Sequence, residues 1–230
     1  MVKENLAAVE QNIRNACARA GRGRSEVTLL CVTKTKPVSM LEEAYAAGER
    51  EFAENKVQEL VDKFSRLPQD IRWHMIGHLQ RNKVKFLTER AAMIHSVDSL
   101  ALAQTISRLS LQEGRVMPVL VEVNIAGEES KFGIAPEETE TLLRAMAPLP
   151  GIRVKGLMTI APYTEEPESN RCYFRALREL SIDIKSKNID NIEINELSMG
   201  MTGDYEVAIE EGATFVRVGT GIFGERHYDS

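Results

Sequence analysis

A lysine follows the most apolar stretch of the chain. Seven of the eight residues from Val27 to Lys34 are apolar or β-branched, which predicts a strand buried on both faces. Side chains alternate along a strand, so Lys34 shares a face with Leu30 and Val32 at the carboxyl end. Loss of water there favours the neutral amine, which captures a carbonyl group as a Schiff base. The alternative is a strand-end lysine that extends into solvent, and Lys36 has the same parity but follows the strand.

Two glycine-rich segments in the last part of the chain have the composition of anion-binding loops. One reads Ser198-Met199-Gly200-Met201-Thr202-Gly203 and the other reads Gly219-Thr220-Gly221. Small residues let backbone N–H groups approach a phosphate closely, and we expect the hydroxyls of Ser198 and Thr220 to contact it as well. The alternative is that these glycines only form tight turns between strands and helices.

Three further polar residues are candidates for the same site. Arg217 interrupts the last predicted strand, and a buried guanidinium needs a partner. That partner is either a ligand or a structural carboxylate such as Glu122 or Glu196. His74 is either a ligand contact or an ordinary core histidine, and Asn55 is either a ligand contact or a helix N-cap.

A strand-end lysine, a phosphate site and a buried arginine together match the requirements of pyridoxal phosphate. Lys34 would hold the aldehyde as an imine, the two loops would hold the phosphate, and Arg217 would face the pyridine nitrogen. Because arginine stays protonated, that nitrogen would stay unprotonated, and the ring would be a weaker electron sink than beside an aspartate. A Schiff-base aldolase acting on a sugar phosphate is an alternative, in which the lysine captures the substrate instead of a cofactor.

Eight predicted strands must position these residues. They span residues 27–34, 51–53, 73–77, 92–97, 118–124, 153–160, 192–198 and 214–219, with an N-terminal helix at about 3–21 and helices between the strands. Ser39 and Glu42 resemble a capping box for the helix after the first strand, and a further helix is predicted over 80–87. This alternation predicts an α/β fold with one domain, a single (β/α)8 TIM barrel over residues 1–230. An open doubly wound sheet is the alternative, but it would be expected to carry a G-x-G-x-x-G turn, which is absent.

Composition argues against several other classes of protein. The net charge of −5 and the lack of a Lys/Arg block argue against a nucleic-acid partner. The three cysteines are far apart, so neither a disulfide framework nor a metal site is expected. The first residues are charged throughout and resemble no signal peptide, and no apolar run of about 18 residues could span a membrane. We therefore expect a cytoplasmic protein.

The sequence resembles the pyridoxal phosphate homeostasis protein family from end to end. The matching segments are Val32-Thr33-Lys34-Thr35-Lys36-Pro37, Phe52-Ala53-Glu54-Asn55-Lys56, Trp73-His74-Met75-Ile76-Gly77, Val123-Asn124-Ile125 with Lys131-Phe132-Gly133, Gly156-Leu157-Met158, Leu197-Ser198-Met199-Gly200-Met201 and Arg217-Val218-Gly219-Thr220-Gly221. Two departures are Ala53, where the family usually has glycine, and His78, where proline is common.

This resemblance implies a barrel similar to the N-terminal domain of alanine racemases, with Lys34 as the imine lysine. It implies that the cofactor is lined by Asn55, Ser198, Met199, Arg217, Gly219 and Thr220, with His74 and Met158 nearby. The racemases complete their site with a second domain, for which this barrel leaves no residues. The expected function is therefore binding of pyridoxal phosphate in vitamin B6 homeostasis, by a monomer without a catalytic residue that passes the cofactor to apo-enzymes. The alternative is a single-domain amino-acid racemase.

Overall fold

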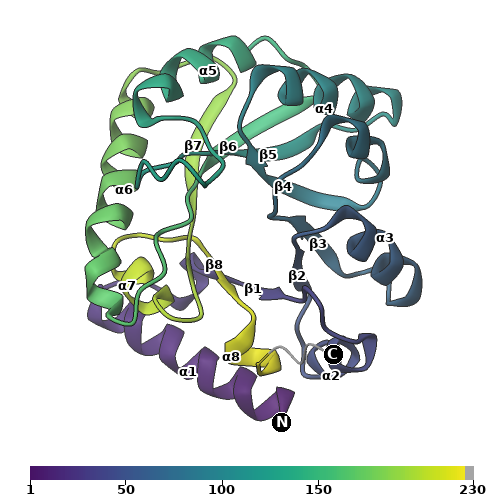
Figure 1. Cartoon of the computed structure of the whole chain (residues 1–230), viewed down its shortest axis with the longest axis vertical. Helices are drawn as coiled ribbons and strands as arrows, with labels where there is room; N and C mark the ends of the chain where they lie inside the picture. The colour runs from purple at the N-terminus through teal and green to yellow at the C-terminus, as the bar shows by residue number, and fades with distance from the viewer. Residues whose placement is uncertain (226–230) are drawn as a thin grey trace.

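The computed structural model describes residues 1–225 and shows a closed barrel of eight parallel strands. They are β1 (Thr28–Val32), β2 (Glu51–Glu54), β3 (Arg72–Met75), β4 (Ala91–Val97), β5 (Met117–Glu122), β6 (Ile152–Met158), β7 (Ile192–Met201) and β8 (Phe215–Val218). Each strand pairs with the next in the chain, and β8 pairs with β1 to close the ring seen in Figure 1. The predicted TIM barrel is confirmed, and the open sheet is not.

Helices surround this ring on the outside (Figure 1). They are α1 (Val2–Arg19), α2 (Val38–Ala46), α3 (Val57–Arg66), α4 (Leu100–Gln112), α5 (Thr139–Met146), α6 (Arg171–Ser186), α7 (Tyr205–Glu210) and α8 (Thr220–Phe223), with short 3-10 segments η1 (Arg24–Glu26), η2 (Arg81–Phe86), η3 (Pro136–Glu138) and η4 (Pro167–Asn170). The first helix packs beside the last, where the Asn5 side-chain amide donates to the carbonyl oxygen of Ile222 at 2.9 Å. Among residues 1–225, none of the helices has the length and apolar character needed to cross a bilayer.

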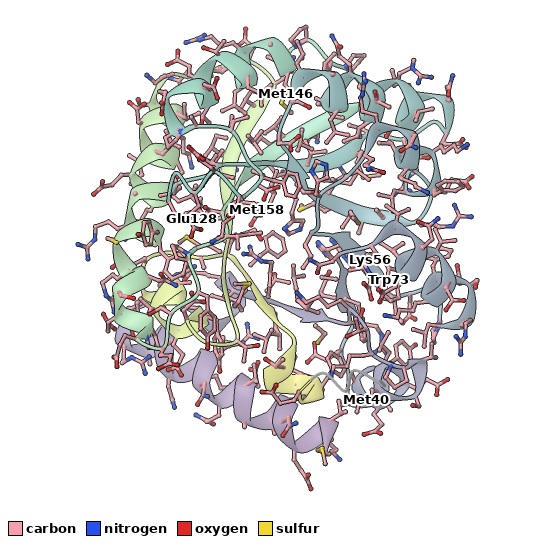
Figure 2. The ribbon with its side chains drawn as sticks, viewed as in Figure 1. Met40, Lys56, Trp73, Glu128, Met146 and Met158 are labelled. Carbon is pink, nitrogen blue, oxygen red and sulfur yellow. The ribbon has the colours of Figure 1, made fainter. Side chains whose placement is uncertain are left out.

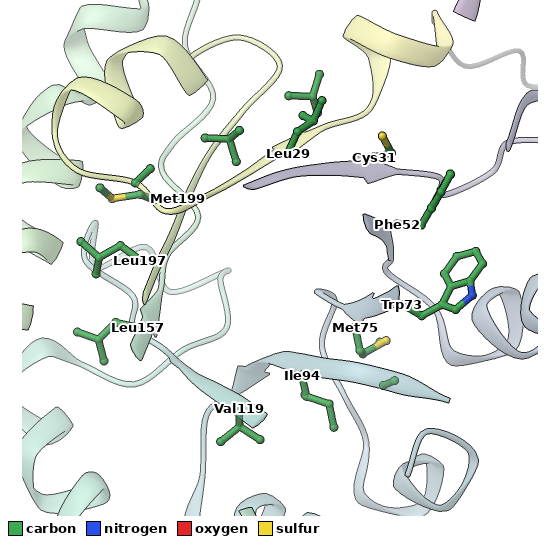
Figure 3. Packing of buried hydrophobic residues seen from close by; sticks show 14 of the residues in the cluster. Leu29, Cys31, Phe52, Trp73, Met75, Ile94, Val119, Leu157, Leu197 and Met199 are labelled. Atoms are coloured by element: carbon green, nitrogen blue, oxygen red, sulfur yellow. The ribbon is translucent and has the colours of Figure 1, made fainter. Parts of the chain in front are cut away.

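Alternation along the strands divides the buried apolar side chains into two layers. The outer layer lies between strands and helices, and Figure 3 shows Leu29, Phe52, Trp73 and Val119 pointing away from the ring. The inner layer fills the barrel and consists of Leu30, Val32, Ala53, Ile76, Met93, Leu120, Met158 and Phe215. The interior is therefore a packed core, and a ligand site is expected at the mouth, the end of the barrel where the strands finish.

Several predicted boundaries differ from the structure. The first strand ends at Val32, so Lys34 lies in the following turn. The predicted capping box is wrong, because α2 begins at Val38 with Pro37 as its N-cap and without a capping side-chain hydrogen bond. The helix predicted over 80–87 is the 3-10 segment Arg81–Phe86. The last five residues of the predicted domain, 226–230, lie outside the described part of the chain.

Candidate functional site

The turn after β1 carries Lys34 at the mouth of the barrel, where its side chain is half-buried. The next residue, Thr35, has a φ of 62°, a left-handed conformation that is unfavourable for a β-branched residue. Contacts from the surrounding structure must therefore hold this turn in place. The predicted strand-end position of Lys34 is displaced by the early end of β1, but the lysine remains at the mouth.

A buried ion-pair cluster packs behind this turn, and the sequence did not indicate it. Lys63 Nζ from α3 lies 2.5 Å from Glu54 Oε1, 2.8 Å from the carbonyl oxygen of Thr33 and 3.2 Å from Glu59 Oε2. Glu59 also accepts the backbone N–H of Thr35 at 2.8 Å. Burial raises the pKa of Glu54, and the charge of Lys63 opposes that shift. The cluster therefore fixes Thr33 and Thr35, the residues on either side of Lys34, which carries the predicted imine amine.

Lys36 has a different role from Lys34. Its Nζ lies 3.2, 2.8 and 2.7 Å from the backbone carbonyl oxygens of Phe223, Gly224 and Glu225. These carbonyls belong to the last residue of α8 and the two residues after it, so Lys36 connects the turn after β1 to the end of the last helix.

Arg217 points into the barrel, and its partners are not the carboxylates that the sequence analysis considered. Its Nη1 donates to Ser198 Oγ at 2.8 Å, and its Nη2 donates to the carbonyl oxygen of Thr159 at 2.8 Å. Within residues 1–225 it forms no ion pair with Glu122 or Glu196. Burial lowers the pKa of Arg217 to about 10, so the guanidinium remains charged at neutral pH.

The two buried histidines of the barrel lie beneath this arginine. His74 contacts Glu51 through Nε2 at 2.7 Å and His95 through Nδ1 at 2.9 Å. His95 continues to Ser198 Oγ at 2.9 Å, and burial holds its pKa well below the usual value. Both histidines are fully buried, so His74 is a satisfied core histidine in the interior of the barrel. The sequence analysis did not single out His95.

Asn55 follows β2 at the mouth and leaves a polar atom unsatisfied. Its Oδ1 is buried without a hydrogen-bond partner among the described residues. It is not the N-cap of α3, because Lys56 occupies that position. The neighbouring strand approaches closely here, since a Cβ on Gly77 would lie 2.2 Å from the backbone oxygen of Asn55. An unsatisfied buried acceptor is costly and rare, which favours a ligand contact for this amide.

The two predicted methionines lie on opposite sides of the barrel wall. Met158 belongs to the inner layer and points toward the middle of the ring in Figure 2. Met199 belongs to the outer layer, and Figure 3 shows its side chain with Leu197 on the helix side. Met158 can therefore offer its side chain to a ligand at the mouth, whereas Met199 can offer only its backbone.

The loops after β7 and β8 meet at one hydroxyl group. Thr202 Oγ1 accepts the backbone N–H groups of Gly219 and Gly221, both at the long distance of 3.3 Å. Asp204 holds the first loop by accepting the N–H of Met201 at 2.6 Å. Thr220 is exposed on the second loop. These amide groups converge as an anion-binding loop requires, and Thr202 is a member that the sequence analysis did not select.

Glu122, at the end of β5, is a buried carboxyl group that makes stability depend on pH. Burial raises its pKa from 4.5 to about 7, with Asp98 adding to the shift and Arg217 opposing it. Since the folded state binds the proton more tightly, stability should fall as pH rises from about 5 to 7, by roughly 3 kcal/mol at most. We expect Glu122→Gln to abolish this fall. Urea unfolding of both proteins without ligand at pH 5 and pH 8 measures it.

The matched control for this prediction is Glu193→Gln. Glu193 is half-exposed, and its pKa is lowered by the hydrogen bond from Lys155, so it stays ionised across the whole interval. That variant should show the same change in stability between pH 5 and pH 8 as the unchanged protein. An equal effect of Glu122→Gln at both pH values would show that Glu122 does not titrate in this range.

The geometry brings most of the predicted site residues to one end of the barrel. Lys34, Asn55, Gly219 and Thr220 surround the mouth, while Arg217, Ser198 and His74 lie below it in the interior. Within residues 1–225, no group of three His, Cys, Asp or Glu side chains is arranged to hold a metal ion. A lysine amine, a buried guanidinium and backbone amides that donate over long distances are suited to an aldehyde that carries a phosphate.

Comparison with known proteins gives a consistent result. The family model described as alanine racemase, N-terminal domain, matches residues 5–227. A protein from Aquifex aeolicus named pyridoxal phosphate homeostasis protein is 46% identical over 226 residues, which cover 98% of each chain. The structure of PipY from Synechococcus elongatus with pyridoxal phosphate bound superposes with a TM-score of 0.83 at 34% identity, covering 97% of this chain and 100% of that one.

An alanine racemase from Clostridium difficile shares the fold alone. Its TM-score is 0.76 at 16% identity, and the match covers 100% of this chain but 57% of the racemase. The match thus leaves a large part of that enzyme uncovered, whereas the Aquifex protein is matched over nearly its whole length. On this basis the chain belongs to the pyridoxal phosphate homeostasis protein family, and its barrel is of the alanine racemase N-terminal type.

Proposed function

We propose that this protein binds pyridoxal phosphate at the mouth of the barrel and takes part in vitamin B6 homeostasis. The observation that carries the proposal is the buried, unsatisfied Asn55 Oδ1 beside the turn that holds Lys34. A second support is Arg217, a buried guanidinium whose hydrogen bonds within residues 1–225 go to a hydroxyl and a carbonyl. The names of the relatives and the cofactor bound in PipY agree with this assignment.

Each predicted residue has a role in this proposal. Lys34 binds the cofactor aldehyde as a Schiff base, Arg217 faces the pyridine nitrogen, and Asn55 supplies an acceptor to the ring. Thr220 and the amides of Gly219 and the neighbouring loop hold the phosphate. Met158 lies below the ring and Met199 contributes its backbone on β7, while His74 and Ser198 lie beneath Arg217 near the cofactor. When bound, the cofactor supplies an electrophilic aldehyde on an electron-withdrawing ring.

Ser198 has a changed role compared with the sequence prediction. Its hydroxyl lies between His95 and Arg217 and is fully buried, so both of its hydrogen-bonding directions are used inside the barrel. We therefore assign the phosphate to Thr220 and to backbone amides, and we assign the Ser198 side chain to the orientation of Arg217. Charge-assisted hydrogen bonds of this kind contribute roughly 1.5–3 kcal/mol each.

We propose further that the protein stores and releases the cofactor and does not turn over amino acids. The curated relatives that match this chain over nearly their whole length are named for pyridoxal phosphate homeostasis and not for a reaction on amino acids. An open mouth lets water reach the Schiff base, which favours exchange over a sequestered reaction. The proposed setting is the cytoplasm, where a monomer passes the cofactor to apo-enzymes without a nucleic-acid or membrane partner.

Deuterium exchange tests this function. Protein loaded with pyridoxal phosphate is incubated with each common amino acid in deuterated water, and exchange of the α-proton is followed by NMR. In parallel, transfer of the cofactor to an apo-enzyme is measured by recovery of that enzyme's activity. We expect transfer without appreciable exchange. Fast, stereospecific exchange that disappears in Lys34→Ala would replace the carrier by the alternative, a single-domain racemase.

A further inference from the structure

A continuous chain of hydrogen-bonded side chains crosses the interior of the barrel beneath the proposed site. Its contacts are Glu51 Oε2 to His74 Nε2 at 2.7 Å, His74 Nδ1 to His95 Nε2 at 2.9 Å, His95 Nδ1 to Ser198 Oγ at 2.9 Å, and Ser198 Oγ to Arg217 Nη1 at 2.8 Å. The three middle members are fully buried, and Arg217 is 4% exposed. The chain therefore joins the start of β2 to the guanidinium at the other end of the barrel.

The two ends of this chain determine the direction of every hydrogen bond in it. Arg217 can only donate to Ser198 Oγ, and the Glu51 carboxylate at the other end can only accept from His74. With both histidine rings neutral, the Ser198 hydroxyl hydrogen is therefore directed to His95 Nδ1. His95 then carries its proton on Nε2 and donates to His74 Nδ1. His74 in turn carries its proton on Nε2 and donates to the Glu51 carboxylate. Each member donates toward Glu51.

The surroundings keep the chain in this arrangement. Phe215 packs against both histidine rings, with centroid distances of 5.6 Å to His74 and 5.3 Å to His95. At the lower end, Arg72 Nε lies 3.0 Å from Glu51 Oε1 and helps to hold that side chain in place. At the upper end, Asp204 and Glu122 are the carboxylates whose charges act on Arg217. Burial disfavours a charge on His95, which agrees with a neutral ring.

We propose that Glu51, His74 and His95 are positioning residues that act through Ser198 to orient Arg217. This inference rests on the proposed function, in which Arg217 faces the pyridine nitrogen. A glutamine at position 51 can donate as well as accept, so the direction of the hydrogen bonds is no longer fixed at that end and can reverse, with His95 Nδ1–H donating to Ser198. The Ser198 hydroxyl hydrogen then turns away from His95. The lone pairs of Ser198 Oγ turn with it, so the hydrogen bond from Arg217 no longer holds the guanidinium in one orientation. A residue at the far end of the barrel thereby influences the electronics of the bound ring.

The first test needs no cofactor and uses the unchanged protein. Nitrogen-15 NMR of histidine-labelled protein distinguishes a protonated ring nitrogen from an unprotonated one. We expect both His74 and His95 to carry the proton on Nε2 at pH 7, with Nδ1 unprotonated. A proton on Nδ1 of either histidine would overturn the inference, whatever the protein binds.

The second test measures coupling to the bound cofactor in Glu51→Gln, which preserves shape and removes the charge. We expect a shifted absorption maximum of the loaded protein, a changed pH profile of that band and cofactor retention weaker by roughly 2- to 30-fold. The matched control is Glu193→Gln, at the same end of the barrel but paired outside it with Lys155, and it should behave as the unchanged protein.

The outcomes separate the inference from the proposed function. A folded Glu51→Gln protein with unchanged spectrum, pH profile and retention would refute the positioning role while leaving cofactor binding intact. If the unchanged protein binds no pyridoxal phosphate, the proposed function fails. The claim that the hydrogen-bonded side chains from Glu51 to Arg217 act on a cofactor then fails with it. If Glu51→Gln does not fold, the histidine tautomers of the unchanged protein decide the matter.

Discussion

Replacing Lys34 with alanine should abolish the covalent cofactor adduct and leave the barrel folded. The substitution removes the only amine that the proposal places in Schiff-base contact with the cofactor, so no adduct can be reduced by borohydride. The side chain is half-buried in the turn after β1 and contributes no volume to either apolar layer. We therefore expect a stability change of about 1 kcal/mol or less. Absorption spectra and urea unfolding measure the two effects.

Lys36→Ala is the control for this prediction. Lys36 contacts three carbonyl oxygens after α8, so its loss should reduce stability without removing the adduct. Although the two lysines are close in sequence, their variants should show opposite results. Lys34→Ala should lose the adduct and keep its stability, whereas Lys36→Ala should keep the adduct and lose stability. A reducible adduct that persists in Lys34→Ala would assign the Schiff base to another amine.

Replacing Lys63 with methionine should destabilise the protein by about 3–5 kcal/mol, because it leaves a buried carboxylate without its counter-ion. The Lys63 side chain is 6% exposed and that of Glu54 is 0% exposed. Burial already raises the pKa of Glu54, and loss of Lys63 raises it further, so the destabilisation should shrink as pH falls and Glu54 takes up a proton. Urea unfolding at two pH values measures it. Cofactor retention should fall too, since the cluster holds the turn at Thr33 and Thr35.

Two comparisons sharpen this result. The double variant Lys63→Met with Glu54→Gln removes both charges and should recover much of the lost stability. Lys155→Met breaks a half-exposed ion pair with Glu193 and should cost under about 1 kcal/mol. If Lys63→Met and Lys155→Met have similar effects, the cluster behind Lys34 is not a buried ion pair of the kind described.

The barrel could be predicted from the sequence because each strand is a short apolar run between helical segments. The run before Lys34 and the run from residue 118 to 124 contain few polar residues, as expected for strands covered on both sides. The residues at which the strands end were less predictable. Lys34 continues the alternation of the first strand in sequence, but the pairing of β1 with β2 ends at Val32, and the turn begins there.

The buried polar contacts could not be predicted in the same way. Lys63 lies on an amphipathic helix, where a lysine ordinarily faces solvent, and only the packing of α3 against β2 buries it beside Glu54. His95 stands in an apolar strand, and alternation with Met93 indicates only that it faces inward. Its partner Ser198 is 103 residues away in the chain, so their contact exists only in the folded barrel.

Ser198 is a residue whose hydrogen-bond partners in the fold could not be predicted from the sequence. A serine before Met199 and Gly200 has the composition of a phosphate loop, and it does lie at the end of the strand pairing of β7 with β6. Its hydroxyl, however, faces the interior because strand alternation places it on the same side as Arg217. Composition alone cannot separate a phosphate ligand from a residue that orients an arginine.

The most direct measurement of the central claim is identification of the modified lysine in the unchanged protein. The protein is loaded with pyridoxal phosphate, reduced with borohydride, digested and mapped by mass spectrometry. We expect one dominant phosphopyridoxyl group, on Lys34, in the peptide that follows β1. Modification at Lys36, at a lysine away from the mouth, or at no site under conditions that saturate binding would contradict it.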